Sequence, residues 1–439
     1  MALRSSRGES RMRNDRPVIT DITALEILDN RGRPTIRARV GTDAGCCGRA
    51  DVPCGSSTGS YEAFDLRDGD ARYGGRGVRR AIANIHDALL PLLLGQDVTD
   101  QRRIDDLMLQ LDGTPDKSRL GGNALLAVSM AAAQAAAASL RLPLYRYLSA
   151  DGHVLPVPQS CLINGGVHAG NDLDAQEFCV MPAGAPTFAE AARVICEVFE
   201  TLRELLERKH GKLATNFGED GGFAPPLRTS REAMDLLCEA VERTGCTADV
   251  VYGIDFAATP LYDCASGTYH FDGRARTPDE MIAAVLELVR QYPTIVSIED
   301  PLQQDDFAGW KAVADALPGV LVVGDDITAT NLGRLRRAVE AGSVNALLCK
   351  VNQAGTLTEA MDAARFAQRH RCPVVMSPRS GETEDDILSD ISVALDAGVF
   401  KIGGPHGSDR GTNFNRFLEI EAELGTVARY AGRDYARLD

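Results

Sequence analysis

Three short apolar runs decide the fold: TIVSIEDP (294–301), VLVVGDDI (320–327) and NALLCKVN (345–352). None of them alternates with polar residues, which is typical of a strand buried on both faces of a parallel sheet. Each run delivers a charged residue at its C-terminal end: Glu299, Asp325 or Lys350. One such residue could belong to a strand that runs into a solvated turn. Three with the same polarity indicate chemistry at the C-terminal edge of a barrel.

Strand-and-helix units repeat on both sides of this stretch. Further apolar runs lie at 154–163, 177–182, 250–257, 373–385 and 399–405. Eight strands alternating with helices predict an α/β fold with a closed, TIM-like (β/α)8 barrel, whose strands we expect to be parallel. The top of this barrel would carry Asp255, Glu299, Asp325, Lys350, Arg379, Ser380 and Lys401.

The chain of 439 residues is too long for one ordinary core and suits two domains. Residues 1–16 are Arg-rich without an apolar segment, so they predict a disordered tail. Alternating residues on both sides of Asn30 predict a hairpin that opens an N-terminal α+β domain over 17–150. The barrel domain would follow over 151–439.

Composition and charge restrict the location and the partners. The apolar share of 44% and the charged share of 25% are typical of a globular protein, and we expect no apolar run long enough to cross a bilayer. The net charge of −15 provides no basic field for nucleic acid. Eleven cysteines without paired or zinc-type spacing predict reduced thiols, no disulfides and a cytoplasmic location.

Three Gly-rich loops connect these elements. The loop PCGSSTGSYEAFDLRDGD (53–70) is typical either of a mobile linker or of a lid that binds an anion. His168 lies in the second loop, nine residues before Glu177, and is either solvated or functional. The third loop, NFGEDGGFAPP (216–226), carries two adjacent acids.

The charged strand ends suggest a metal site. Asp255, Glu299 and Asp325 would offer Mg²⁺ an all-oxygen ligand set, although an ordinary acidic rim looks the same in sequence. Lys350 and Lys401 on flanking strands favour the metal site, since a lysine in such surroundings can act as a base; structural salt bridges are the alternative. Together these groups suit abstraction of a proton next to a carboxylate, where a divalent cation stabilises the added charge. Arg379 and Ser380 would suit a phosphoryl group.

Eight segments resemble the enolase family, and the resemblance extends from about residue 18 to 425: DNRGRPT, GSSTGSYEA, LINGGVHAGNDLDAQEF, SIEDP, GDDITATN, LLCKVNQAGT, SGETED and FKIGGP. The resemblance implies an enolase-type barrel with an N-terminal capping domain, Mg²⁺ as the cofactor and a homodimer or higher homo-oligomer. It implies catalytic roles for Lys350, Glu177 and Asp220. The implied metal ligands are Asp255, Glu299, Asp325 and Ser57, and the implied substrate-binding residues are His168, Gln176, Arg379, Ser380 and Lys401.

Two positions depart from the family pattern. Enolases have Gly-Asp-Glu-Gly-Gly where this chain has Glu219 followed by Asp220, and Ser-His-Arg-Ser where it has Pro378. The Asp220 carboxylate is therefore set back by one methylene, and Pro378 cannot shuttle a proton. We expect these changes to weaken ordinary water elimination and to leave room for a bulkier group, because a positioned general acid contributes about 10²–10⁴-fold.

These departures lead to the main functional expectation, a specialised paralogue that resembles the carboxyphosphonoenolpyruvate synthases of phosphinothricin-type antibiotic pathways. It would act on a small phosphorylated or phosphonate carboxylate, with a nucleotide-activated donor. The alternative is a phosphopyruvate hydratase that converts 2-phosphoglycerate to phosphoenolpyruvate, with Glu219 replacing the missing glutamate. A third reading is a non-catalytic binding protein on an enolase scaffold.

Overall fold

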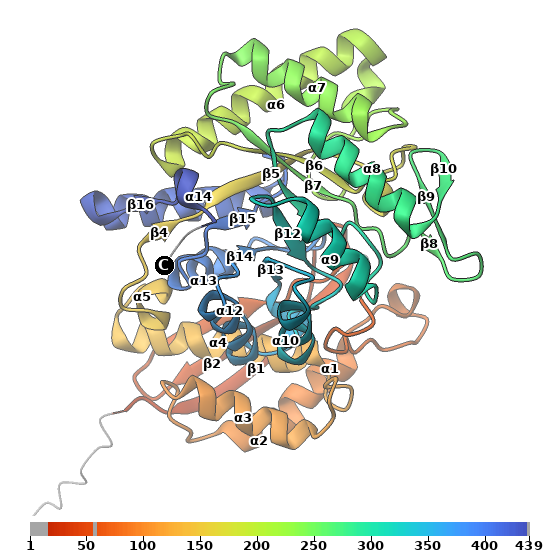
Figure 1. The fold of residues 1–439 in the computed structure, drawn as a ribbon. Coiled ribbons are helices and arrows are strands. Elements are labelled where there is room, and N and C mark those ends of the chain that lie inside the picture. Colours follow the sequence, from red (N-terminus) through yellow and green to blue (C-terminus); the bar gives the residue numbers. More distant parts are fainter. Residues whose placement is uncertain (1–15, 56–58, 437–439) are drawn as a thin grey trace, which may run out of the picture.

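The computed structural model describes residues 16–55 and 59–436, in an N-terminal α+β part and a barrel (Figure 1). The N-terminal sheet is antiparallel, in the order β1 (Ile19–Leu28), β2 (Pro34–Thr42), β3 (Cys47–Asp51). Strands β1 and β2 form the predicted hairpin. Of the predicted tail only Arg16 is described, and it pairs with Asp97 at 3.2 Å.

Helical segments complete the N-terminal part. They include α1 (Arg79–Asn84), the π-helical turn η2 (Ile85–Leu89), α2 (Leu90–Leu93), α3 (Gln101–Asp112), α4 (Gly122–Leu140) and α5 (Leu144–Leu148). Of these, α1, η2, α2 and α4 pack against the sheet. The small residues of α4 allow it to pack closely on the sheet. At Gly48 of β3 a Cβ atom would lie only 2.1 Å from the Ala131 carbonyl oxygen of α4, so this contact requires glycine.

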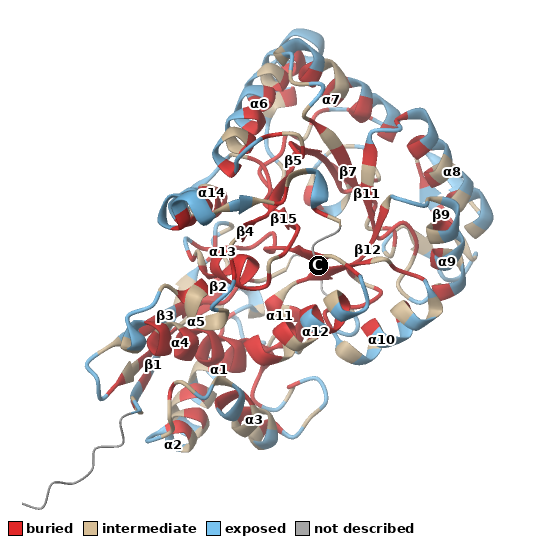
Figure 2. Ribbon diagram, turned by 60° about the vertical axis from the view of Figure 1, so that its left-hand side comes forward, coloured by how far each residue is buried: buried red, intermediate tan, exposed pale blue. Residues whose placement is uncertain are grey.

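The expectation that no apolar run could cross a bilayer is wrong as a statement about length, because α4 is long and apolar enough to do so. Its residues 122–133 are all buried inside the protein. The apolar surface of α4 therefore serves the core of the N-terminal part, where Figure 2 shows the helix almost wholly as buried ribbon.

Eight strands close into a barrel in the order β11-β12-β13-β14-β15-β5-β6-β7. Their bounds are β5 (Val157–Asn164), β6 (Glu177–Met181), β7 (Val251–Asp255), β11 (Ile295–Glu299), β12 (Leu321–Gly324), β13 (Ala346–Cys349), β14 (Val374–Met376) and β15 (Val399–Lys401). The barrel and the α+β part confirm the predicted fold class.

The prediction of an all-parallel barrel is wrong at β6, which is antiparallel to both β5 and β7. A parallel connection needs a crossover, usually a helix, whereas β5 and β6 are joined by a loop with only one short 3₁₀ turn (Gly166–His168). The chain therefore returns directly as a hairpin. Because β6 runs in reverse, its first residue, Glu177, lies at the edge where the parallel strands end, level with Asp255 of β7.

The barrel is surrounded by helices, seen around the strands in Figure 1. They are α6 (Phe188–His210), α7 (Ser230–Thr244), α8 (Pro278–Gln291), α9 (Phe307–Ala316), α10 (Leu332–Ala341), α11 (Val351–Ala354), α12 (Leu357–Arg369), α13 (Ile387–Ala394) and α14 (Ser408–Leu424). Reciprocal capping boxes, Thr229 with Glu232 and Thr277 with Glu280, fix where α7 and α8 begin.

Two small sheets lie outside the barrel wall. The strands β8 (Tyr262–Asp263), β9 (Thr268–Phe271) and β10 (Arg274–Arg276) form one sheet, and β4 (Val154–Leu155) pairs with β16 (Arg429–Tyr430). The lower interior of the barrel is apolar, with Val157, Met181, Val323, Leu348 and Val399 packed together. All eleven cysteines fall within the described residues and are free thiols.

Candidate active site

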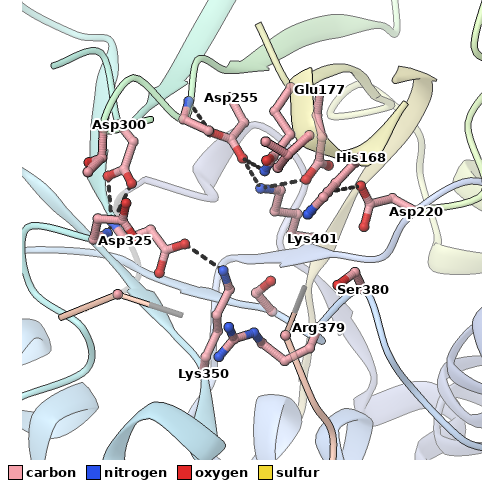
Figure 3. A pocket seen from close by; sticks show the side chains of 18 of the residues that line it. His168, Glu177, Asp220, Asp255, Asp300, Asp325, Lys350, Arg379, Ser380 and Lys401 are labelled. Carbon is pink, nitrogen blue, oxygen red and sulfur yellow. Dashed lines mark hydrogen bonds and ion pairs between the residues drawn. The ribbon is translucent and has the colours of Figure 1, made fainter. Parts of the chain in front are cut away.

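A cavity of about 240 Å³ opens at the top of the barrel, where the charged strand ends converge. The predicted residues that line it are His168, Gln176, Glu177, Asp220, Asp255, Asp325, Lys350, Arg379, Ser380 and Lys401. Figure 3 shows these side chains pointing toward one another from different strands and loops. Glu299 lies just behind the cavity wall, and Ser57 lies outside the described residues.

Lys401 at the end of β15 holds three carboxylates together. Its Nζ atom lies 2.8 Å from Glu299 Oε2, 2.9 Å from Asp255 Oδ2 and 3.0 Å from Glu177 Oε1. Burial lowers the pKa of Lys401, but the three carboxylates outweigh burial and raise it well above its ordinary value. Lys401 is therefore a permanent cation among these acids.

Lys350 follows β13 and pairs with Asp325, which follows β12. Lys350 Nζ donates to Asp325 Oδ2 at 2.5 Å, and Gln353 Nε2 donates to Asp325 Oδ1 at 2.7 Å. Asp300 orients this carboxylate, because its own oxygens accept hydrogen bonds from the backbone amides of Asp325 and Asp326. Burial lowers the pKa of Lys350, whereas the Asp325 carboxylate raises it. The net result is a pKa above the ordinary value of a lysine.

The carboxylates fit a hard divalent cation. Four carboxyl groups, those of Asp255, Glu299, Asp325 and Glu177, lie beside the two ammonium groups of Lys350 and Lys401. Glu299 Oε1 is buried and has no hydrogen-bond partner among the residues that the structure describes, and both burial and the Asp255 carboxylate raise the Glu299 pKa well above its ordinary value. An acceptor without a partner and a carboxyl that is held neutral by burial and by its neighbours are what Mg²⁺ with oxygen ligands would satisfy.

A second group of acids lies beside the predicted ligands. Oxygens of Asp300, Asp325 and Asp326 lie within 4.8 Å of one another. Burial and the Asp325 carboxylate raise the pKa of Asp326 to about 6. Asp325 thus belongs both to this acidic group and to the pair with Lys350. Sequence reasoning did not single out Asp300 or Asp326, although they directly follow the predicted Glu299 and Asp325.

His168 and Asp220 meet on the opposite wall. His168 Nδ1 lies 2.7 Å from Asp220 Oδ2, which also accepts a hydrogen bond from Asn164 Nδ2 at 2.9 Å. Burial raises the pKa of Asp220, but His168 lowers it more, so the carboxyl is ionised. His168 Nε2 is buried, and within the described part of the chain it has no hydrogen-bond partner. The pair therefore presents one nitrogen of an anchored imidazole.

Glu177 and Gln176 connect this wall to Lys401 and Asp255. Gln176 Nε2 donates to Asp255 Oδ2 at 3.0 Å. Burial raises the pKa of Glu177 to about 6, against the opposing effect of Lys401. Of the carboxyls on this wall, Glu177 is thus the one that exchanges a proton near neutral pH, whereas Asp220 stays ionised.

Arg379 and Ser380 occupy the remaining side of the cavity. Arg379 Nη1 lies 2.8 Å from Glu62 Oε2 in a buried ion pair, and Ser380 Oγ accepts a hydrogen bond from Arg31 at 3.1 Å. Glu62 and Arg31 come from the N-terminal part of the chain. Sequence reasoning missed both, although each lies in a segment that resembles the family.

The residues at the two departures from the family pattern do not all lie in the cavity. Asp220 and Pro378 line the cavity. The Glu219 carboxylate lies 3.4 Å from Arg31 and is partly exposed. Glu219 therefore does not take the place of Asp220 in this structure, and it is the shorter side chain that faces His168.

Comparisons with known proteins cover nearly the whole chain. Residues 19–148 match the family model "Enolase, N-terminal domain", and residues 152–438 match "Enolase, C-terminal TIM barrel domain". The chain is 48% identical over 423 residues to the enolase of Methanocaldococcus jannaschii, which covers 96% of this chain and 99% of the relative. It is also 48% identical to the enolase of Pyrococcus furiosus over 424 residues, or 96% of this chain and 98% of the relative.

These relatives overturn the main functional expectation. These relatives, which are similar to this chain over nearly their full length, carry the plain name enolase. The protein of Methanopyrus kandleri, which is 48% identical to this chain, carries the same name. The expected carboxyphosphonoenolpyruvate synthase-like reaction, with its nucleotide-activated donor, is therefore wrong. Asp220 and Pro378 are compatible with an ordinary family site, because the Asp220 carboxylate still reaches the cavity and His168. On its sequence, its barrel and its capping part alike, this chain belongs to the enolase family.

Proposed function

We propose that the protein is a phosphopyruvate hydratase, which eliminates water from 2-phosphoglycerate to give phosphoenolpyruvate. The observation that carries this proposal is the division of the cavity into two sides. Lys350 stands beside Asp325 on one side, and Glu177, His168 and Asp220 stand on the other. A base and a proton donor on opposite sides of a substrate are what an elimination requires.

Each residue has a role in this proposal. Lys350 removes the proton from the carbon next to the substrate carboxylate. Lys401 contacts the substrate carboxylate, and Arg379 with Ser380 binds the phosphoryl group. Mg²⁺ held by Asp255, Glu299 and Asp325 would supply positive charge that stabilises the extra charge on the substrate carboxylate. Lys350 releases its proton more readily when Asp325 is engaged by a cation, since that carboxylate raises its pKa.

Proton delivery to the leaving hydroxyl is assigned to Glu177. Its pKa of about 6 leaves a protonated fraction near neutral pH, whereas Asp220 is held ionised by His168. Asp220 in turn orients His168 and raises its pKa. With this division of roles, the shorter Asp220 side chain does not need to deliver the proton.

The test is formation of phosphoenolpyruvate from 2-phosphoglycerate with Mg²⁺, together with hydrogen exchange at substrate C2 in D₂O. We expect turnover in the wild type. Lys350→Ala should lose both exchange and turnover by about 10²–10⁴-fold, and Lys350→Arg should not restore them, since arginine does not deprotonate. The surface variant Lys311→Ala is the matched control. A wild type that shows neither exchange nor turnover would favour the non-catalytic reading.

The location and assembly of the protein follow from the same proposal. A cytoplasmic enzyme with reduced thiols agrees with eleven free cysteines. A homodimer or higher homo-oligomer stays a prediction from the family resemblance, and sedimentation of the purified protein measures it.

A further inference from the structure

Two thiols lie inside the barrel directly beneath the catalytic layer. Cys161 of β5 and Cys179 of β6 are register partners in the antiparallel ladder, and both side chains are fully buried. Cys179 Sγ lies 3.9 Å from Glu177 Oε2. The two sulfur atoms and a Glu177 oxygen all lie within 4.8 Å of one another. The reversed direction of β6 creates this arrangement, because it places Glu177 above Cys179 on the inner face of one strand.

The spacing of these three atoms matches a small thiophilic cation. Zinc binds thiolate sulfur at about 2.3 Å and carboxylate oxygen at about 2.0–2.2 Å, so tetrahedral ligands lie roughly 3.5–3.8 Å apart. The observed separations require side-chain shifts of about 1 Å or less to reach this geometry. We propose that Cys161, Cys179 and Glu177 form a site for a thiophilic divalent cation of the Zn²⁺ class, distinct from the all-oxygen Mg²⁺ ligands.

Charge balance favours this site despite its burial. A divalent cation that binds two thiolates replaces the two thiol protons, which leave to solvent, so the net charge of the buried layer does not change. Glu177 already has the Lys401 ammonium as its partner at 3.0 Å. Without a cation the thiols are neutral, because burial raises the pKa of both Cys161 and Cys179. The pair is therefore inert to ordinary thiol chemistry and responds to a cation that takes the place of its protons.

The cation has a direct route to the thiols. Glu177 lines the cavity, and Cys179 lies next to it on the same strand, so an ion that enters the cavity reaches the pair by passing one side chain. Binding draws the Glu177 carboxylate toward the sulfurs and away from Lys401. This effect on catalysis rests on the proposed role of Glu177 as the proton donor, whereas the binding itself does not. A thiophilic cation would thus inhibit the enzyme without occupying the Mg²⁺ ligands.

Cadmium is the probe, because cadmium–thiolate bonds absorb in the near ultraviolet and ¹¹³Cd NMR distinguishes sulfur from oxygen ligands. The exposed thiols are first removed with Cys47→Ser, Cys196→Ser and Cys264→Ser. In saturating Mg²⁺ this background protein should bind one Cd²⁺ per chain with a thiolate absorption band. Adding Cys161→Ser or Cys179→Ser should each abolish the band. The half-buried Cys238→Ser is the matched control and should retain it.

Two results would overturn the site. One is the absence of a thiolate band in the background protein, and the other is a band that survives both Cys161→Ser and Cys179→Ser. Thermal unfolding checks that each variant folds, and Cys179→Ala provides a second, apolar replacement. Because the readout is spectroscopic, it decides the site even if the protein proves to have no hydratase activity.

Inhibition tests the coupling to Glu177. We expect Cd²⁺ to inhibit phosphoenolpyruvate formation in the background protein by tenfold or more at one equivalent per chain, without relief by excess Mg²⁺. Cys179→Ser should remove this inhibition. Inhibition that excess Mg²⁺ relieves, and that Cys179→Ser leaves in place, would show instead that Cd²⁺ acts at the oxygen ligands. A thiolate band without inhibition would refute the coupling.

Discussion

His168 Nδ1 lies 2.7 Å from Asp220 Oδ2, and both side chains are buried in the wall of the cavity. Burial lowers the pKa of His168, but Asp220 raises it more, so the imidazole titrates above its ordinary value of 6.5. The contact therefore influences the charge of a side chain that lines the cavity. It also explains how an aspartate can serve where the family has a glutamate.

Replacing Asp220 should reverse the shift of His168. In Asp220→Asn burial still lowers the His168 pKa and only the weaker effects of Glu177 and Glu219 raise it, so this pKa should fall, and NMR titration of the imidazole measures the change. The stabilisation by the charged pair is complete below the unfolded pKa of His168 and is lost as pH rises through the raised folded pKa. The variant should thus lose most stability relative to wild type below pH 6. Asp174→Asn, beside the exposed His270, is the control. An unchanged His168 titration would refute this account.

Glu299→Gln should separate the stability of the protein from its binding of Mg²⁺. Because the pKa of Glu299 is raised well above its ordinary value, the metal-free protein favours the neutral carboxyl, which glutamine imitates. We expect a change in unfolding free energy within about 1 kcal/mol without metal. Mg²⁺ at 100 times its Kd should stabilise the wild type by about 2.7 kcal/mol and the variant far less. Calorimetric unfolding with and without Mg²⁺ measures both, with the exposed Asp315→Asn as control. Equal Mg²⁺ stabilisation in the two proteins would exclude Glu299 as a ligand.

Glu382 should make the protein less stable at alkaline pH. Burial raises the pKa of this carboxyl to about 8. A carboxyl whose pKa is higher in the folded state stabilises most at low pH, and that contribution is lost as pH rises from about 4.5 to about 8. Glu382→Gln keeps the acceptor for the Arg379 amide, which lies 2.7 Å from Glu382 Oε1. The variant should match the wild type near pH 4.5 and exceed it above pH 8 by on the order of 4 kcal/mol.

Denaturant unfolding at a series of pH values measures this difference. The exposed neighbour Glu384→Gln should follow the wild type throughout. A Glu382→Gln protein that gains no stability between pH 5 and pH 9 would contradict the prediction.

Glu62→Gln should loosen the junction between the two parts of the chain. The variant removes the carboxylate of the buried ion pair in which Glu62 Oε2 lies 2.8 Å from Arg379 Nη1. Breaking a buried ion pair costs about 3–5 kcal/mol, and we expect a loss of unfolding free energy of that order together with a raised KM for the phosphorylated substrate. Glu287→Gln removes an exposed ion pair with Arg290 and should change stability by less than about 1 kcal/mol. Similar losses in the two variants would argue against a special role for Glu62.

The residues at the ends of parallel strands could be predicted from sequence. Asp255, Glu299, Asp325, Lys350 and Lys401 each end an apolar run or directly follow it, and parallel strands carry such residues to one edge. Periodicity also sufficed for the number of barrel strands. These features depend only on short stretches of chain and on a general rule of barrel architecture.

Other residues could not be placed in this way. Glu177 begins its strand, and only the reversed direction of β6 brings it to the catalytic edge. Glu62 contacts Arg379 across 317 residues of sequence, so its place depends on how the N-terminal part packs on the barrel. The specialised reaction was inferred from Asp220 and Pro378 as residue types, without the contact between Asp220 and His168 that only the structure shows.

The antiparallel β5–β6 hairpin also bears on the order in which the protein folds. Its strands are separated by one loop, so they can pair after closing a short segment of chain, whereas β15 pairs with β5 across more than 200 residues, joining Lys401 to Gln159. Closure of the barrel by β15 is therefore the slow, entropically costly step. That same step delivers Lys401 to Glu177, Asp255 and Glu299, so a folding intermediate with an open barrel would hold these three carboxyls without their counter-ion.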